Sequence, residues 1–408
     1  SVLRLADSMN SRVILVGDTR QHSAVSRGDA MRLIENEAGI RPAEIHEVMR
    51  QSGDYKRAIT AIASGDVLYG FDLLDKQKAI IEQPDAGARY HQLIDEVLAG
   101  ALDETLVVAP TNREAETVTS LMRHELKKRG ALGTEDTPCR TLKNLNWTEA
   151  QRTDQAQYRD GMVLVFHQRA NGVAIGEQLT ITGLSVDSVP LARNRAGQTV
   201  RVPIDQPSRF SVFEERTLGI APGDMIRMKR GSRTKDRKHE LMNGRSYCVK
   251  AVRNNGDIEL QNGWVVDKDF GGFDYGYVTT SYSSQGRTVN RVFVAEDSHS
   301  GRAASTEQFY VSASRGRREV KIFTDNKDAL KESIQRSAAR PSATELMQGM
   351  VTGDLKPKSR NDTMRAYGAW MRHHMRVKQQ NPQFVAGRSD DLVQEARRDA
   401  FRSMGVDR

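Results

Sequence analysis

Continuous apolar runs alternate with stretches of helical spacing in two parts of this chain, before about residue 140 and again between about 277 and 335. The run VILV at 13–16 has no polar alternation, which is typical of a strand buried on both faces of a parallel sheet. The run TLVVAPT at 105–111 has the same character. Comparable segments follow late in the chain. Strand-like runs lie at 277–282, 291–297 and 319–325, and a helical stretch lies between the last two, at 307–316. This alternation predicts an α/β fold with a parallel sheet.

Helical spacing fills the segments between these strands. Apolar residues three and four positions apart predict helices at 1–10, around 31–34, 45–49 and 59–63, and at 93–98. Asn112 is placed to cap a further helix directly after the strand at 105–111. The two together predict a strand–loop–helix unit.

The pattern changes between about 140 and 275, where short alternating runs are separated by tight turns. Asn-Gly pairs at 171–172, 255–256 and 262–263 mark hairpins. A small β-barrel and a pair of hairpin sheets both fit this pattern. Because the α/β alternation resumes afterwards, we interpret this stretch as a β-rich insertion within an α/β domain.

Residues 336–408 form a polar, basic tail with 14 Lys and Arg against 8 Asp and Glu. One amphipathic helix is predicted within it, at 363–380. Its apolar stripe either docks on the protein itself or binds a partner. A second basic cluster at 225–240 has seven Lys and Arg against two acids. Such clusters suit a polyanion, although a solvated surface loop and tail explain them equally well.

Composition excludes several classes of protein. The 408 residues hold no apolar run near the roughly 18 that a membrane span needs, and the first ten residues do not resemble a signal peptide. Cys139 and Cys248 lie far apart and form no metal-ligand or redox pair. We therefore predict no membrane partner, no metal site within the chain, and a cytoplasmic location.

Four segments carry the candidate chemistry: GDTRQ (17–21), VMRQ (48–51), SYSSQGRT (281–288) and YVSASRGR (310–317). In this order and spacing they resemble motifs III, IV, V and VI of superfamily 1 DNA helicases of the RecD-like branch. The resemblance is strongest to the helicase half of conjugative relaxases of the TraI/TrwC kind, and it covers roughly residues 1–335. Members of this family are ATP-dependent motors that move 5′ to 3′ on single-stranded DNA.

The resemblance implies RecA-like motor domains and a boundary scheme. Residues 1–70 would end the first motor domain, and 71–139 with 276–335 would make the second. The β-rich stretch 140–275 would be an SH3-like insertion, and 336–408 a basic, partly helical tail. The chain would then be the C-terminal part of such a helicase.

Phosphoryl transfer to water needs positive charge on the γ-phosphate and a polar group that orients the attack. Guanidinium groups stay ionised and bind phosphate oxygens bidentately, which makes Arg50 and Arg315 the candidates for that charge. The resemblance implies catalytic roles for these two arginines and Gln21, which would sense the γ-phosphate. It adds nucleotide contacts from Gly17, Asp18, Gln285 and Gly286. An isolated arginine near a helix end is more often a surface ion pair or a cap, so only the ordered set supports these roles.

The segment APTNREAE at 109–116 resembles the part of the second motor domain that touches the DNA backbone. Hydroxyl and amide groups can hydrogen-bond phosphates, which positions DNA without reading its sequence. The predicted DNA contacts are Thr111, Asn112, Thr280 and Ser284. Ser283 stands where related helicases commonly have a lysine, which removes one expected cation.

No segment matches G-x-x-x-x-G-K-[ST], and the dipeptide Gly-Lys never occurs, so the chain has no P-loop. The Asp-Glu pair of LIDEVL at 93–98 has helical spacing and does not suit Mg²⁺. We therefore expect ATP and Mg²⁺ to bind only the complete protein, with a missing N-terminal helicase part as a partner. The sequence leaves open whether a relaxase domain lies farther upstream. On this hypothesis the chain begins just after the Walker B segment and is inactive alone. The alternatives are a non-catalytic module that binds single-stranded DNA or another partner, and a purely structural protein.

Overall fold

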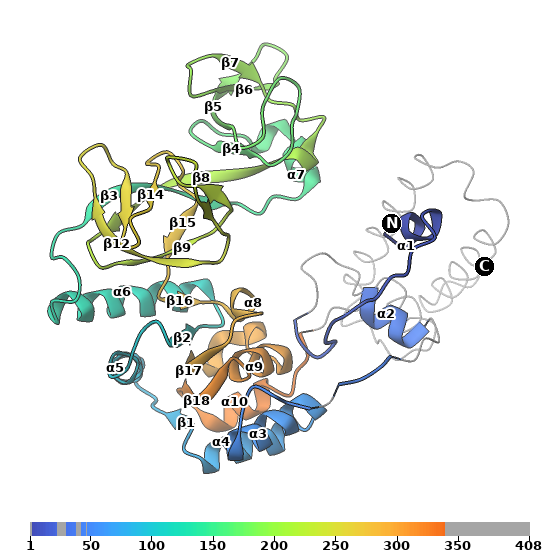
Figure 1. Cartoon of the computed structure of the whole chain (residues 1–408), viewed down its shortest axis with the longest axis vertical. Coiled ribbons are helices and arrows are strands. Elements are labelled where there is room, and N and C mark those ends of the chain that lie inside the picture. Colours follow the sequence, from blue (N-terminus) through green and yellow to red (C-terminus); the bar gives the residue numbers. More distant parts are fainter. Residues whose placement is uncertain (1, 23–29, 38–41, 46, 339–408) are drawn as a thin grey trace, which may run out of the picture. The chain divides into compact units, whose positions relative to one another are not determined.

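The computed structural model describes residues 2–22, 30–37, 42–45 and 47–338 (Figure 1). The predicted helix at 363–380 and nearly all of the basic tail lie outside these residues. None of the helices that the structure describes has the length and apolar character that crossing a membrane requires.

Five parallel strands form the central sheet, in the order β1-β18-β17-β2-β16. Their bounds are β1 (Ile80–Glu82), β2 (Thr105–Val108), β16 (Val278–Thr279), β17 (Val289–Ala295) and β18 (Gly316–Thr324). The predicted α/β class with a parallel sheet is confirmed. Because all five strands run the same way, their carboxyl ends meet at one edge, where ligands of such sheets bind.

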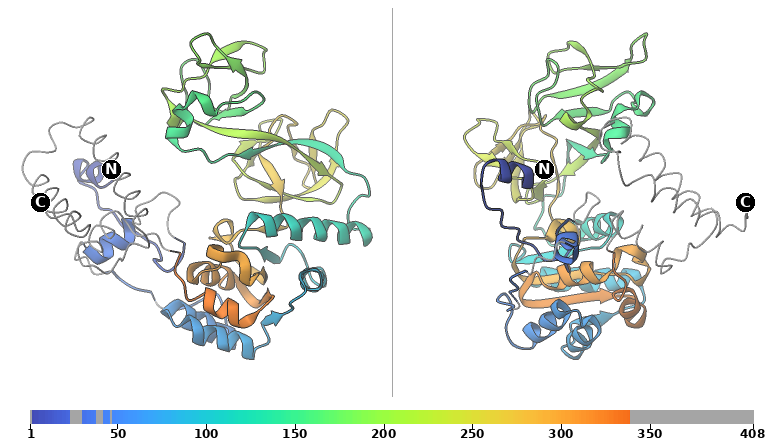
Figure 2. Two further views of the ribbon diagram at one scale, coloured as in Figure 1. Left: turned by 180° about the vertical axis from the view of Figure 1, so that it is seen from behind. Right: turned by 90° about the vertical axis from the view of Figure 1, so that its right-hand side faces the viewer.

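Helices cover both faces of this sheet (Figure 1 and Figure 2). Alternate residues of each strand enter two separate cores, so Leu106 and Val108 pack in one and Val107 in the other. The first core includes α3 (Gly53–Ser64), α4 (Val67–Lys76), α9 (Thr306–Ala313) and α10 (Lys327–Ser333). The second includes α5 (Ala86–Leu98) and α6 (Asn112–Lys128). Burial on both faces explains the continuous apolar runs of β2 and of the second half of β17 in the sequence.

The chain between α6 and β16 forms antiparallel sheets, as the short alternating runs predict. One sheet has six strands in the order β3-β8-β4-β5-β6-β7, with bounds β3 (Thr137–Asn144), β4 (Val163–Phe166), β5 (Gln178–Leu184), β6 (Pro190–Arg193), β7 (Thr199–Arg201) and β8 (Phe210–Ile220). A second has five in the order β14-β13-β12-β9-β15, with bounds β9 (Met225–Met228), β12 (Ser246–Val252), β13 (Ile258–Leu260), β14 (Val265–Val266) and β15 (Phe273–Tyr275). A hairpin joins β10 (Ser232–Arg233) to β11 (Glu240–Leu241). Each large sheet has its own apolar core.

Tight turns join many of these strands. Gly256 and Gly263 have φ angles of 88° and 82°, a left-handed conformation that favours glycine. Both follow asparagine, so the predicted Asn-Gly turns are confirmed at these two positions. Short helical segments complete the described chain: α7 (Glu149–Thr153), α8 (Ser281–Ser284), and the 3₁₀ helices η1 (Gln155–Gln157), η2 (Pro207–Arg209) and η3 (Ser298–Ala303).

The predictions for the first fifty residues are partly wrong. Helices α1 (Val2–Ser8) and α2 (Ala30–Glu37) form, but residues 13–16 form no strand, and Ile14 and Val16 are 85% and 90% exposed. Among the described residues no strand lies beside this run, so its backbone has no ladder to join. Among the described residues of 45–49, none lies in a helix, contrary to the prediction. Ile45 and Met49 are exposed there, and Val48 packs against the first core without a helix around it.

Candidate functional site

Arg315 lies directly after α9, at the turn that leads into β18. Its side chain is buried, with 3% of the residue exposed. The guanidinium Nε donates to the carbonyl of Val311 at 2.8 Å, and Nη2 donates to Ser314 Oγ at 2.9 Å. Burial, and next the nearby charge of Arg50, lower the pKa of Arg315 to about 10, so it stays positive at neutral pH.

Side chains of residues 50–55 donate hydrogen bonds to the backbone carbonyls of this turn. Arg50 and Gln51 both donate to the carbonyl of Ser314, the latter at 3.0 Å, and Gln51 also donates to the carbonyl of Gly316. The Tyr55 hydroxyl donates to the carbonyl of Ala313 at 2.5 Å. The structure thus brings together Arg50 and Arg315, the two arginines that were predicted to bind the γ-phosphate. Gln51 and Tyr55 were not predicted as site residues, because only the folded chain shows which carbonyls they meet.

The GDTRQ segment meets the loop after α8. Gln285 Nε2 donates to Gln21 Oε1 at 3.3 Å, and Gln21 Nε2 donates to Asp18 Oδ2 at 2.9 Å. The Tyr310 hydroxyl, on α9, donates to the same Asp18 oxygen at 3.3 Å. A chain of hydrogen bonds therefore links three of the predicted nucleotide contacts. Two more of the predicted nucleotide contacts, Gly17 and Gly286, are exposed in the same two segments.

His22 follows Gln21 and was not predicted as a site residue. Its Nε2 shares a hydrogen bond with Ser281 Oγ at 2.9 Å, and its ring stacks on Tyr282 with centroids 3.7 Å apart and planes 12° from parallel. Burial is the main cause that lowers the pKa of His22 to about 4. The ring is therefore neutral at pH 7. Only its position next to Gln21 in the sequence pointed to it.

Two of the predicted DNA contacts cap helices at the carboxyl ends of paired strands. Thr111 follows β2 and caps α6, where it exchanges bonds with Glu114 in a capping box. Thr280 follows β16 and caps α8. Because Val108 and Thr279 are register partners, both threonines lie at the same sheet edge.

Two predictions about this edge need correction. Asn112 does not cap α6: it is the first residue of the helix, and Thr111 is the cap because its side chain accepts from the Glu114 backbone. Ser284 does not reach the surface. It is fully buried, and its hydroxyl donates to the carbonyl of Ser281 at 2.7 Å, so its side chain cannot meet a phosphate in this structure.

The β-rich insertion adds positive charge to the same edge. Arg227, on β9, donates to Thr279 Oγ1. Burial and then the charge of Arg287 lower its pKa, while burial and then Arg227 lower the pKa of Lys229. Like charges held close together favour an anion between or beside them.

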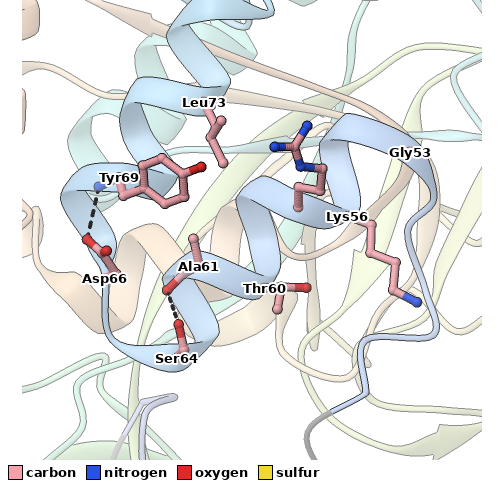
Figure 3. A pocket seen from close by; sticks show the side chains of 9 residues that line it. Gly53, Lys56, Thr60, Ala61, Ser64, Asp66, Tyr69 and Leu73 are labelled. Atoms are coloured by element: carbon pink, nitrogen blue, oxygen red, sulfur yellow. Dashed lines mark hydrogen bonds between the residues drawn. The ribbon is translucent and has the colours of Figure 1, made fainter.

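No metal site accompanies these residues. Across the part of the chain that the structure describes, no cluster of three His, Cys, Asp or Glu side chains could hold a metal ion. A cavity of about 440 Å³ lies between α3 and α4 (Figure 3). Its lining contains none of the predicted site residues: Gly53, Lys56, Arg57, Thr60, Ala61, Ser64, Asp66, Tyr69 and Leu73.

Comparison with known proteins agrees with the motif pattern. A family model described as an AAA domain matches residues 1–85. The multifunctional conjugation protein TraI of Escherichia coli K12 is 22% identical over 388 residues, covering 80% of this chain and 21% of that protein. A second Escherichia coli TraI is 20% identical, over 83% of this chain and 22% of that protein. The chain thus spans about a fifth of the length of these relatives.

Solved helicase structures are also similar to the chain. The Pif1 helicase from Bacteroides in complex with ADP-AlF3 and ssDNA is 15% identical over 76% of this chain and 56% of that chain, with a TM-score of 0.27. The Pif1 helicase from Candida albicans is 12% identical over 75% of this chain and 60% of that chain, with a TM-score of 0.26. The TraI relatives confirm the resemblance to conjugation proteins of the TraI kind, and the family model covers two of the four motif segments, GDTRQ and VMRQ.

Proposed function

We propose that this chain is a portion of an ATP-dependent DNA helicase that belongs to a conjugative relaxase. The observation that carries this proposal is the pair Arg50 and Arg315. Both contact the turn at Ser314, and among the described residues no carboxylate forms an ion pair with either. Two guanidinium groups held together without an ion pair suit a phosphate.

On this proposal the two arginines bind the γ-phosphate of ATP and stabilise the charge of the transition state. Gln21 lies within hydrogen-bond distance of both Asp18 and Gln285, so a shift at the phosphate can reach the loop of Gln285. That loop follows Thr280 at the sheet edge where we place DNA. The hydrogen-bond chain is the proposed link between nucleotide and DNA.

Single-stranded DNA is the proposed partner at that edge, with movement from 5′ to 3′ as in the family. Thr111 and Thr280 are the proposed phosphate contacts, with Arg227, Lys229 and Arg287 as neighbouring cations. The parallel sheet belongs to the proposed RecA-like motor domain, and the β-rich stretch 140–275 is the proposed SH3-like insertion. Since the proposed partner is DNA inside the cell, the cytoplasm is the proposed location of the protein.

The residues present fit only one side of a nucleotide. The sequence has no P-loop, and the described residues offer no Mg²⁺ ligand cluster, so no residue here takes the role of holding the β-phosphate or the metal. We therefore expect no ATP hydrolysis by this chain, measured as phosphate release with and without single-stranded DNA. DNA-stimulated release by the purified chain would refute that expectation.

A second candidate is a DNA-binding module on a helicase scaffold, and the missing P-loop is the observation that favours it. Sequencing the coding DNA upstream of Ser1 separates the two. An open frame with a Gly-Lys-Thr loop and a strand ending in Asp-Glu is the result expected of a helicase portion. A stop codon or an unrelated sequence favours the module, which would bind single-stranded DNA in a salt-sensitive way without any effect of nucleotide.

A further inference from the structure

The rings of Tyr282 and His22 form an exposed aromatic stack at α8, the short helix that Thr280 caps. Tyr282 is 51% exposed although its ring packs against His22, so one side of the ring is covered and the rest is open to solvent. The two rings come from segments far apart in the sequence, and the bond from His22 to Ser281 fixes the imidazole behind the phenol. The stack is therefore built by the fold and not by neighbouring residues.

The stack is next to groups that suit a phosphate backbone. Thr280 caps α8 and Ser283 follows Tyr282 within this helix, and the hydroxyls of Thr280 and Ser283 are 3.3 Å apart. Arg227 reaches the start of this helix from the insertion through Thr279, and Arg287 follows it in the chain. A single-stranded nucleic acid presents the matching chemistry, since its phosphates take cations and hydroxyls while its bases stack on aromatic rings.

We propose that Tyr282, supported from behind by His22, is a stacking platform for a nucleobase of single-stranded DNA. The proposal rests on the proposed function, because it adds a base contact to the DNA-binding edge. This stacking contact differs from the phosphate contacts in one respect: the ring binds the nucleobase and not the sugar-phosphate backbone. A neutral imidazole keeps the support free of charge, so the phenol remains the surface that the base meets.

The test compares two short oligonucleotides of equal length by fluorescence anisotropy. One is oligo-thymidine, and the other carries the same sugar-phosphate backbone with stable abasic sites. Loss of one stacked base weakens binding about tenfold or more. We expect Tyr282→Ala to bind oligo-thymidine about tenfold more weakly than the unchanged chain, and to bind the abasic strand with unchanged affinity. Tyr282→Phe, which keeps the ring, should bind both strands like the unchanged chain.

Two further variants separate stacking from a loss of structure. Tyr69→Ala removes a tyrosine on α4 that is exposed to a similar extent, 48%, and should change neither affinity. His22→Ala should weaken only the oligo-thymidine complex, while His22→Phe should preserve it. Circular dichroism of each variant checks that the fold is kept.

The outcomes are distinct. Tyr282→Ala binding both strands as tightly as the unchanged chain, or losing the same factor on both, would overturn the stacking platform and leave the proposed function standing. Binding of neither strand by the unchanged chain would reject the proposed function together with the platform.

Discussion

Glu296 directly follows β17 and has a carboxyl group that solvent barely reaches. The residue is 1% exposed, and within the described chain its Oε1 has no hydrogen-bond partner. Gln308 Nε2 donates to its Oε2 at 3.4 Å. Burial, with a smaller effect from Glu114, raises the pKa of Glu296 to about 8. The carboxyl is therefore mostly protonated at neutral pH.

This raised pKa predicts a pH dependence of stability. Since the folded chain holds the proton more tightly than the unfolded one, the contribution is fully present below the ordinary pKa of 4.5 and is lost as pH rises through about 8. Glu296→Gln cannot ionise, so its free energy of unfolding should fall less between pH 5.5 and 8.5. Urea unfolding at both pH values measures this. Glu135→Gln, at an exposed position, should keep the slope of the unchanged chain, and equal slopes for all three would rule the effect out.

Arg315 gives a second prediction at this scale. In a polypeptide that also contains a phosphate-binding loop, Arg315→Ala should lower DNA-stimulated ATP turnover by about 10³-fold or more, the range of an arginine that stabilises transferred phosphate. Affinity for single-stranded DNA should stay close to the original value. Arg317→Ala, two residues later and exposed, is the matched control. Near-normal turnover in Arg315→Ala would remove this residue from the site.

Elements whose burial is local were predictable from the sequence. Strand β2 and the second half of β17 are buried on both faces, which gives uninterrupted apolar runs, and α5 has a regular apolar face. The strand predicted at 13–16 fails for lack of a neighbour, since no described strand lies beside this run. An apolar pattern states what a segment would bury, and it does not state whether a partner is present.

The candidate site was predictable to the extent that motifs mark it. Arg50, Gln21, Gln285 and Arg315 come from separate segments, and the structure brings these segments together. Gln51, Tyr55 and His22 act on carbonyls or rings that are distant in sequence, so no local pattern reveals them. Ser284 shows the opposite error: a motif residue that faces inward because a short helix turns its hydroxyl onto Ser281.

The start of α6 gives a prediction at the element scale. Thr111 makes both halves of the capping box with Glu114, so Thr111→Ala should lower the free energy of unfolding by about 1 kcal/mol. Thr117→Ala removes a hydroxyl from an exposed position inside the same helix, where alanine is the better helix former, and should not destabilise the chain. Chemical denaturation of both variants gives the comparison. Equal stability of the two would show that the cap contributes nothing.

At the scale of the whole described chain, one buried ion pair joins the insertion to the parallel sheet. Asp224, before β9, is fully buried and accepts from Arg123 on α6 through both oxygens at 2.8 Å. Tyr277, before β16, donates to it at 2.8 Å. These contacts connect β9, the strand of the insertion that carries Arg227, to the edge of the parallel sheet that carries Thr280.

Removing one partner of a buried pair leaves the other charge without compensation. Asp224→Ala should therefore lower the free energy of unfolding by about 3 kcal/mol, near the low end for such pairs because Arg123 keeps Asp136. Arg216→Ala breaks an exposed pair with Glu214 and should cost at most about 1 kcal/mol. Denaturant unfolding resolves the difference, and similar losses in both variants would contradict a joining role for Asp224.

The place of the insertion in the chain has a consequence for the order of folding. β2 and β16 are neighbours in the parallel sheet, yet residues 109–277 lie between them in the sequence. Closing so long a loop costs conformational entropy before the two strands gain anything from pairing. The antiparallel sheets consist of mostly nearby strands with cores of their own, so they can form first and shorten that loop. The strand that leads to Thr280 would then be among the last to join, and the DNA edge would be completed only in the final stage of folding.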